Sequence, residues 1–329
     1  MPVMMNSSPY RLPVIDVSGL DGGAGERRAV ADALDAACRE SGFFYISNHG
    51  IPQTLIDQVV SEAQRFFALP ADEKSAVSMA KSKCRNGYDP LRGQILEPGT
   101  PPDLKESFFV GLEVSPDDPR AAGGLYGPNQ WPPGLPTFRS ALETYHAVMG
   151  DLAARLMGGV ALSLDLDEDY FTDFCQDALA VVRLLHYPPQ EPNPAPGELG
   201  CGAHTDFGAL TLLYQDEVGG LQVHMPDKGW IEAPPIPGTY VVNLGDMIAR
   251  WTNDRYRSTL HRVVNRSRRD RYSVPFFYSG NPEHLVECIP TCRRSDEAPH
   301  YPPITVAGHI AERYRQPGFI GARIGARPA

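Results

Sequence analysis

Three residues in the second half of the chain have the types and spacing of a metal site. His204 and Asp206 are separated by one residue, and His261 opens a second segment further along. In an extended chain, residues i and i+2 point to the same side, so His204 and Asp206 can face one ion while another strand supplies His261. Two imidazoles and one carboxylate on one face of an octahedron leave three positions open, an arrangement that suits Fe(II).

The residues that follow His261 suggest what occupies the open positions. Arg271 and Ser273 come after a polar turn at residues 266–270. If the flanking segments form a hairpin centred near Arg266, Arg271 lies opposite His261 and close to the metal. A guanidinium offers a planar fork to a carboxylate, and the Ser273 hydroxyl adds a donor on the same face. We expect this pair to anchor a dicarboxylate whose other end chelates the metal.

Short strands are predicted to position these residues. Beyond about residue 178 the apolar pattern changes to the period of strands. Six strands are expected, at residues 179–187, 210–214, 221–224, 240–244, 260–265 and 272–278. Because no long helix separates them, they favour an antiparallel sandwich or jelly roll over a parallel sheet. A helix at residues 137–162, with apolar residues every three or four positions, is expected to back the sheet.

The first part of the chain predicts a mixed α/β region. Residues 13–17 and 42–46 are predicted strands, each followed by a helical pattern. The glycines at residues 19–25 lack the G-x-G-x-x-G spacing, and no Walker lysine follows, so a loop entering a helix is favoured over a nucleotide site. Residues 81–136 are rich in Gly, Pro and charge and predict long connections with short strands over a surface.

These segments resemble a known family, the iron- and 2-oxoglutarate-dependent oxygenases of the isopenicillin N synthase-like group. The shared motifs are HTDFG (204–208), QD (215–216) with GGLQV (219–223), NLGD (243–246), HRVV (261–264), RYSVPFF (271–277), PVID (13–16), GFFYI (42–46), NHG (48–50) and NQWP (129–132). The resemblance spans nearly the whole chain. It implies a mainly β fold, a double-stranded β-helix or jelly-roll core flanked by α-helices, with the N-terminal mixed α/β region attached.

The expected organisation is one compact unit with four parts. An N-terminal non-haem dioxygenase region covers residues 1–135, and backing helices cover residues 136–175. The jelly-roll core covers residues 176–290, and a C-terminal helix and tail follow at residues 291–329. We expect residues 84–111 and the chain after Pro290 to select the substrate, with tail residues closing over the pocket.

The resemblance also implies the reaction. Fe(II) is expected at His204, Asp206 and His261, with 2-oxoglutarate and O2 as co-substrates and no catalytic residue beyond the metal ligands. The enzyme is expected to hydroxylate or desaturate a small-molecule metabolite with release of succinate and CO2. An aspartate at position 206, in place of an open halide site, argues against halogenation.

The 2-oxoglutarate contacts expected from the resemblance are Arg271, Ser273 and Tyr187. Many plant members of the family carry Asn-x-Tyr before a Pro-Pro pair, with both residues contacting the co-substrate. This chain keeps Tyr187 before Pro188 but has Leu185 in the place of the Asn. Loss of one amide contact is expected to weaken 2-oxoglutarate binding by ~1 kcal/mol, a factor of about five.

Two alternative functions remain open at the level of sequence. Isopenicillin N synthase itself retains the Arg-x-Ser motif without using 2-oxoglutarate, so an Fe(II) oxidase that draws all four electrons from its substrate is the first. A jelly-roll binding protein, or a zinc-dependent hydrolytic site with the same three ligands, is the second.

Other polar and aromatic residues near the motifs are given structural roles. His186 and His224 are expected to be packed or surface histidines. Asp246 is expected to accept backbone hydrogen bonds in a turn and is left out of the site. Aromatic residues in strands are core by default, and three of them are assigned to the core or pocket wall: Phe207, Trp251 and Phe276.

Composition excludes several classes of partner. The net charge of −10, from 30 basic and 40 acidic residues, would not attract phosphate backbones, so no nucleic-acid partner is expected. No apolar run is long enough to cross a bilayer, so no membrane partner is expected. The N-terminus lacks the pattern of a secretory signal, and the six cysteines are scattered. We therefore expect reduced thiols and a cytoplasmic protein.

Overall fold

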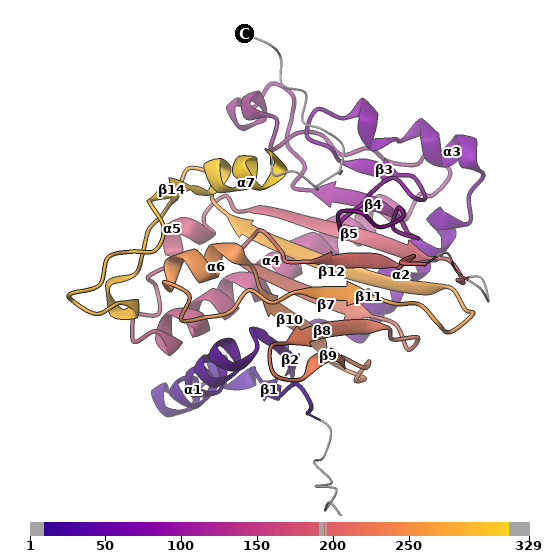
Figure 1. Cartoon of the computed structure of the whole chain (residues 1–329). Coiled ribbons are helices and arrows are strands. Elements are labelled where there is room, and N and C mark those ends of the chain that lie inside the picture. The colour runs from indigo at the N-terminus through magenta and orange to yellow at the C-terminus, as the bar shows by residue number, and fades with distance from the viewer. Residues whose placement is uncertain (1–9, 191–193, 195, 316–329) are drawn as a thin grey trace, which may run out of the picture.

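Two β-sheets face each other at the centre of the fold, and the long helices cover the outer side of the larger sheet (Figure 1). The computed structural model describes residues 10–190, 194 and 196–315. The expected closure of the tail over the pocket falls mostly on residues outside this set. The arrangement is a double-stranded β-helix flanked by helices, as expected.

The larger sheet has the strand order β1-β2-β10-β7-β12-β5-β4-β3. β1 and β2 run in parallel, and the other neighbouring strands are antiparallel. Its strands are β1 (Val14–Asp16), β2 (Phe43–Ser47), β3 (Gly87–Asp89), β4 (Glu106–Gly111), β5 (Leu179–Tyr187), β7 (Leu210–Gln215), β10 (Tyr240–Leu244) and β12 (Arg271–Gly280). The N-terminal strands therefore extend the same sheet as the strands of the second half.

The smaller sheet has the order β6-β11-β8-β9, with antiparallel neighbours. Its strands are β6 (Cys201–His204), β8 (Leu221–Met225), β9 (Gly229–Glu232) and β11 (His261–Val263). A separate two-stranded sheet pairs β13 (Leu285–Val286) with β14 (Ile304–Thr305).

Alternation along the strands of the larger sheet builds two cores. On β2, Phe44 and Ile46 belong to the core under the helices, whereas Phe43 and Tyr45 belong to the core between the sheets. The same alternation places Leu185 of β5 between the sheets. Because successive side chains point to opposite faces, one strand can complete the helix-side core and line the pocket at once.

Helices α1 (Ala24–Glu40), α2 (Gln53–Phe67) and α4 (Phe138–Ser163) pack together on the outer face of the larger sheet. The buried residues of α4 recur at helical spacing, and this helix contacts both β5 and β12. The remaining helices are short: α3 (Ala71–Ala76), α5 (Thr172–Cys175), α6 (Asp246–Trp251), α7 (Val306–Arg315) and the 3-10 turns η1 (Ser18–Asp21), η2 (Met79–Lys81), η3 (Pro119–Gly123) and η4 (Pro290–Cys292). No helix within the described ranges combines the length and apolar character needed to cross a bilayer.

Most of the predicted elements are confirmed within a few residues. Strands β5, β7, β8, β10 and β12 and helix α4 lie where the periodicity places them. Strands β6 and β9 were not predicted, and the segment 81–136 contains β4, which is largely buried inside the large sheet and is not a surface connection. Four-residue strands are too short to show a clear alternation, which explains the two omissions.

The predicted hairpin between the His261 and Arg271 segments is wrong. β11 pairs with β6 and β8 of the small sheet, whereas β12 pairs with β5 and β7 of the large sheet. The chain changes sheet between the two strands, where the Asn265 side-chain amide donates to the carbonyl oxygens of Tyr187, Pro188 and Arg269. These contacts hold the connection away from a hairpin geometry.

Candidate metal centre and co-substrate pocket

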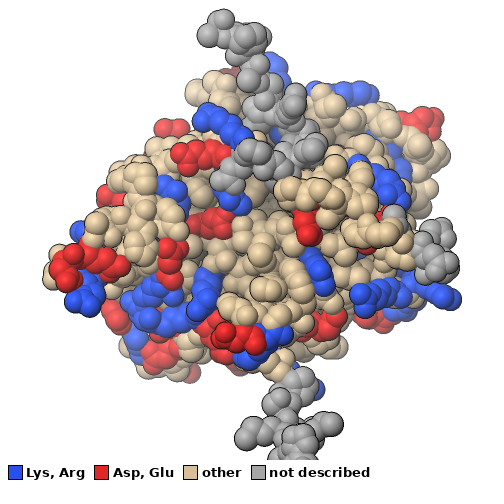
Figure 2. All heavy atoms as spheres, viewed as in Figure 1, with Lys and Arg blue, Asp and Glu red and all other residues tan. Residues whose placement is uncertain are grey.

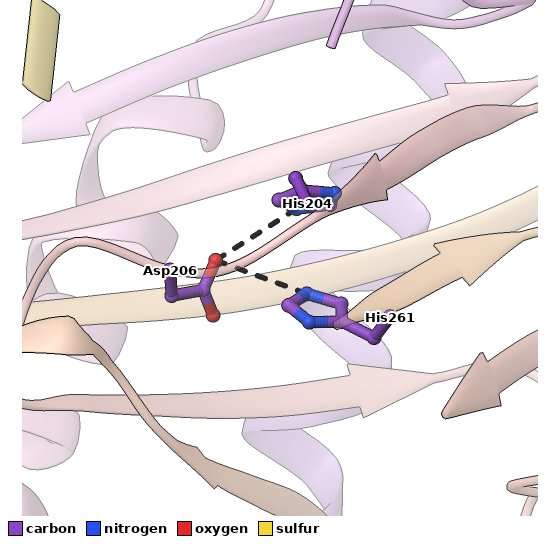
Figure 3. Close-up of side chains that lie close together, drawn as sticks. All are labelled: His204, Asp206 and His261. Atoms are coloured by element: carbon purple, nitrogen blue, oxygen red, sulfur yellow. Dashed lines mark ion pairs between the residues drawn. The ribbon is translucent and has the colours of Figure 1, made fainter. Parts of the chain in front are cut away.

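The three predicted metal ligands converge at the edge of the small sheet (Figure 3). His204 ends β6 and lies opposite His261, the first residue of β11, while Asp206 follows in the loop after β6. Asp206 Oδ1 is 3.8 Å from Nε2 of each histidine, and the ligand atoms lie within 4.8 Å of one another. These separations exceed hydrogen-bond length and leave room for an ion between the three atoms.

Backbone carbonyl groups orient both imidazoles. His204 Nδ1 lies 2.8 Å from the carbonyl oxygen of Gly202, and His261 Nδ1 lies 3.2 Å from that of Thr259. A carbonyl can only accept, so each Nδ1 carries the proton and donates it. This tautomer leaves the Nε2 lone pair of each ring directed at the space beside Asp206, as metal-binding histidines require.

Asp206 offers one oxygen to that space. Its Oδ2 accepts hydrogen bonds from Thr211 Oγ1 at 2.6 Å and from Asn243 Nδ2 at 2.7 Å. Both donors belong to the large sheet, on β7 and β10. Oδ1 remains directed at the two histidines, so the carboxylate is set up as a single-oxygen ligand.

A glycine fixes the loop that carries Asp206. The N–H of Gly245 donates to Ala209 O at 3.0 Å, and the N–H of Asp246 donates to Asp206 O at 2.8 Å. A Cβ atom on Gly245 would lie 2.2 Å from Gly208 O and 2.9 Å from Asp206 O. A residue with a Cβ atom does not fit between these carbonyl groups. Gly245 of the NLGD motif therefore allows the loop that carries Asp206 to pack closely against the start of α6.

Burial places the ligands in the protonation states that bind metal. It lowers the pKa of His261 to about 4, with the neighbouring His204 adding to the effect, and it lowers the pKa of His204 as well. Burial alone would raise the pKa of Asp206, but the two histidines and its two hydrogen-bond donors outweigh it and lower that pKa. At neutral pH the group is two neutral imidazoles and one carboxylate, the form that takes up a divalent cation without releasing protons.

Arg271 is a fully buried cation beside the metal centre. Its Nε donates to Gly219 O at 2.5 Å, Nη1 to Ser273 Oγ at 3.2 Å and Nη2 to Gln215 Oε1 at 3.4 Å. The guanidinium also lies over the Tyr187 ring, 4.7 Å from its centroid. None of these partners is a carboxylate, and no ion pair to Arg271 is present within the described ranges. A buried guanidinium of this kind fits a ligand that brings its own carboxylate.

One cavity between the sheets joins the six predicted site residues, which we call the inner pocket. Its lining includes His204, Asp206, His261, Arg271, Ser273 and Tyr187. Arg271 reaches it from the large sheet, not from across a hairpin, so the convergence was predicted for the wrong geometric reason. Leu185 pairs with Ser273 in the sheet register and also lines the inner pocket, so the amide expected from the family is replaced by an apolar wall.

Four polar residues of the site were missed from the sequence. Thr211 and Asn243 hold Asp206, and Lys105 and Arg183 line the inner pocket. Strand alternation would have placed Thr211 and Asn243 on the inner face once the facing strands were known. A lone arginine within the apolar strand 179–187 was a signal for Arg183.

The other candidates lie outside the inner pocket. His186 Nδ1 lies 2.8 Å from Glu106 Oε1, and its Nε2 lies 2.7 Å from Asp270 Oδ1. Phe276 and Trp251 belong to the helix-side core, and His224 packs edge-on against Trp230.

Asp246 requires a correction in detail. Its carboxylate accepts from the side chains of Ser258 at 2.6 Å and Thr205 at 3.2 Å and lies 2.9 Å from Arg313 Nη2, so the expected backbone partners are wrong. It faces a separate polar cavity of about 670 Å³ between α6 and α7, and it is not one of the converging ligands.

Comparison with known proteins gives consistent matches over most of the chain. The pattern described as non-haem dioxygenase in morphine synthesis N-terminal matches residues 12–134, and that of the 2OG-Fe(II) oxygenase superfamily matches residues 178–280. The 2-oxoglutarate-Fe(II) type oxidoreductase hxnY of Emericella nidulans is 44% identical over 319 residues, covering 94% of this chain and 91% of the relative. The 2-oxoglutarate-dependent dioxygenase citB of Monascus ruber is 42% identical, covering 95% and 97%.

Solved structures share the fold. A full-length Neurospora crassa protein in complex with alpha-KG superposes with a TM-score of 0.83 at 32% identity, over 94% of this chain and 97% of that one. A 2OG-Fe(II) oxygenase family protein from Caulobacter crescentus superposes with a TM-score of 0.82 at 32% identity, over 94% and 99%.

Proposed function

Because the chain belongs to the 2-oxoglutarate and Fe(II) oxygenase superfamily, we propose that its iron binds at His204, Asp206 and His261. The observation that carries this assignment is the convergence of three ligand atoms whose neighbouring atoms are already engaged. Each Nδ1 is bound to a carbonyl, and Asp206 Oδ2 is bound to two donors. Only the atoms that point to the common space remain available.

The protein is a 2-oxoglutarate-dependent Fe(II) dioxygenase, and the two alternatives that lack this co-substrate are set aside by its relatives. When bound, iron, 2-oxoglutarate and O2 supply an oxidising power that no side chain has, and 2-oxoglutarate leaves as succinate and CO2. The chain contributes ligands, orientation and a dry pocket.

We propose that Arg271, Ser273 and Tyr187 hold the far carboxylate of 2-oxoglutarate. Arg271 supplies the charge, and the contact with Gly219 fixes its guanidinium before the ligand arrives. The Ser273 hydroxyl already touches Nη1 and can turn its proton toward the ligand. The Tyr187 ring covers the guanidinium and keeps water from it, which strengthens a charged contact in a low-dielectric site.

The substrate is proposed to be a small molecule that is hydroxylated or desaturated. The inner pocket lies between the two sheets and has a largely apolar lining with a few charged groups, which is typical of a site for a small molecule. On the face shown in Figure 2, Lys and Arg are interspersed with Asp and Glu, so no extended basic surface is present there to gather a nucleic acid. The net charge of −10 supports the same choice.

Two measurements test the proposed function. Anaerobic addition of Fe(II) and then 2-oxoglutarate to the metal-free protein is expected to produce a visible charge-transfer band, and admission of O2 is expected to yield succinate. A folded protein that binds Fe(II) but shows neither the band nor succinate would overturn the co-substrate assignment. A protein that binds no Fe(II) would overturn the metal site itself.

A further inference from the structure

We propose that Arg183 forms a second anion-binding position in the inner pocket and that the substrate is a small organic acid whose carboxylate binds there. The inference rests on the proposed function, because it concerns the substrate of the same site. It assigns a chemical class to the substrate and a specificity role to a residue that holds neither the metal nor 2-oxoglutarate.

The Nε donor of Arg183 makes no hydrogen bond to the residues that the structure describes. The residue is 9% exposed and lies on β5, on the same face as Leu185 and Tyr187. Its Nη2 donates to Gln94 Oε1 at 2.8 Å and to Ser107 Oγ at 2.9 Å. Its Nε is buried without a hydrogen-bond partner among the residues that the structure describes. An unsatisfied buried donor costs free energy, and a ligand oxygen would remove that cost.

The surroundings of Arg183 position its guanidinium and neutralise its charge only in part. Its carbon Cζ lies 4.4 Å from the centroid of the Phe109 ring, so stacking fixes the plane of the group. Asp89 Oδ2 is 4.0 Å from Nη2, beyond hydrogen-bond length. Burial raises the pKa of Asp89 against the attraction of Arg183, Lys105 and Arg85. The ion pair between Asp89 and Arg183 is therefore long and includes no hydrogen bond, and the Nε donor of Arg183 stays available to a ligand.

Lys105 gives the contrast within the same pocket. Its ammonium group forms an ion pair with the fully buried Asp103 and contacts Cys201 Sγ at 3.3 Å. Asp103 in turn accepts from Gly202 N at 2.9 Å, which ties it to β6. The charge of Lys105 is therefore matched inside the protein, whereas that of Arg183 is matched only in part.

A count of charges in the filled pocket leaves Arg183 as the cation that is matched least, because its one carboxylate partner in the described part of the chain, Asp89, is 4.0 Å away. Bound Fe(II) would have its two charges balanced by Asp206 and one carboxylate of 2-oxoglutarate. The second carboxylate of 2-oxoglutarate would balance Arg271. Lys105 has Asp103 as a close partner, whereas Arg183 has only the distant Asp89 and an Nε donor without a hydrogen bond among the described residues. The anion that remains to be supplied is therefore one at Arg183, and the substrate is the molecule that can supply it.

The apolar part of the pocket wall indicates the chemical character of the substrate beyond its carboxylate. Apart from Leu185, which stands where a 2-oxoglutarate contact is expected, the apolar residues that line it include Phe43, Leu213, Leu221, Val263, Pro275 and Phe277. Such a wall favours a hydrocarbon chain or an aromatic ring over a sugar or a polyamine. The structure therefore predicts a compact acid with one carboxylate and an apolar body.

The test compares acids with uncharged molecules of the same shape. Benzoate, phenylacetate and hexanoate are titrated, each beside its carboxamide, into the anaerobic Fe(II) and 2-oxoglutarate complex of the full chain. Binding is followed as a change in the visible charge-transfer band. At least one acid is expected to bind roughly 10- to 100-fold more tightly than its amide, the ratio of a charged to a neutral hydrogen bond.

Variants assign the preference to Arg183. Arg183→Gln is expected to reduce the acid-to-amide ratio to about threefold or less, while Arg183→Lys retains most of it. The affinity for 2-oxoglutarate is expected to stay within about twofold in both, because Arg271 is unchanged. Arg294→Gln is the matched control, because Arg294 is an exposed arginine, 81% accessible in its side chain, and this variant is expected to keep the full ratio.

Each outcome decides the proposal. It is overturned if the amides bind as tightly as the acids, if none of the three acids changes the band, or if Arg183→Gln keeps the acid preference. Should Arg183→Gln fail to fold, the comparison in the unmodified protein decides alone. A missing band before any acid is added would instead show that the proposed function has failed.

Discussion

Replacement of Arg271 by Gln separates the co-substrate site from the metal site. Arg271 is fully buried, and its neutral hydrogen-bond partners leave its charge for a ligand. A hydrogen bond to a charged group contributes about 1.5 to 3 kcal/mol. Arg271→Gln is therefore expected to raise the Kd of 2-oxoglutarate by roughly 10- to 150-fold. The iron ligands do not contact Arg271 directly, so the Kd of Fe(II) is expected to change by less than about twofold.

The assay is an anaerobic titration of the Fe(II) form with 2-oxoglutarate, followed by the visible charge-transfer band. Arg269→Gln is the matched control, because it removes the same charge two residues earlier. The Arg269 side chain is 57% exposed and pairs with Glu217, which is 81% exposed. Surface ion pairs of this kind contribute little, so this variant is expected to bind 2-oxoglutarate as the unmodified protein does.

Two results would refute the reasoning. If Arg271→Gln binds 2-oxoglutarate with unchanged affinity while holding Fe(II), the anchor lies elsewhere, and Arg183 is the next cation to test. If the variant loses Fe(II) and 2-oxoglutarate together while it remains folded, Arg271 supports the metal centre and the two sites are not separable. Thermal unfolding of each variant shows whether the fold has survived.

Three further predictions concern single residues. His204→Ala is expected to weaken Fe(II) binding by roughly 100-fold or more, since loss of an outer contact alone costs about 10- to 100-fold; equilibrium dialysis measures it, and retained iron would contradict the ligand set. Leu185→Asn is expected to tighten 2-oxoglutarate binding about fivefold by adding an amide, and a weaker or equal Kd would count against it. Burial opposes protonation of His186, but hydrogen bonds to Glu106 and Asp270 outweigh it and raise its pKa above 6.5. The stabilisation from His186 is thus complete below the unfolded pKa and is lost as pH rises through the folded pKa. His186→Gln should therefore lower the Tm more at about pH 5.5 than at about pH 8.5, and the opposite order would contradict this sign.

Local spacing was enough to predict that His204 and Asp206 lie close together, whereas His261 comes from a distant segment. His204 and Asp206 come from adjacent positions of one face, and this relation needs no knowledge of the fold. The strand at residues 179–187 shows what local spacing does not reveal. The ends of this strand were predicted correctly, but Arg183 could not be assigned to the pocket from the sequence. That assignment requires knowing which sheet faces the strand, and the facing sheet is set by pairing between distant segments.

The failed hairpin shows what local reasoning lacks. A polar turn between two apolar segments is typical of a hairpin, yet here the same residues carry the chain from one sheet to the other. The decisive contacts are made by Asn265, whose amide binds carbonyl groups at residues 187 and 188, far away in sequence. Strand pairing in a jelly roll is set by such long-range contacts, which a turn of five residues does not encode.

This topology determines which site residues each sheet supplies. The small sheet presents both histidines, while the large sheet supplies the donors that hold Asp206 and the cations Arg271 and Arg183. A metal bound by the proposed ligands would therefore be held by the small sheet and the loop after β6, and it would be linked to the large sheet only through the hydrogen bonds that Asp206 Oδ2 accepts from Thr211 and Asn243. The anions would bind to the large sheet, whose inner face carries the charge. Rigid strands on both sides thus fix the distance from the metal to each guanidinium, and this distance decides which carbon of a bound acid faces the iron.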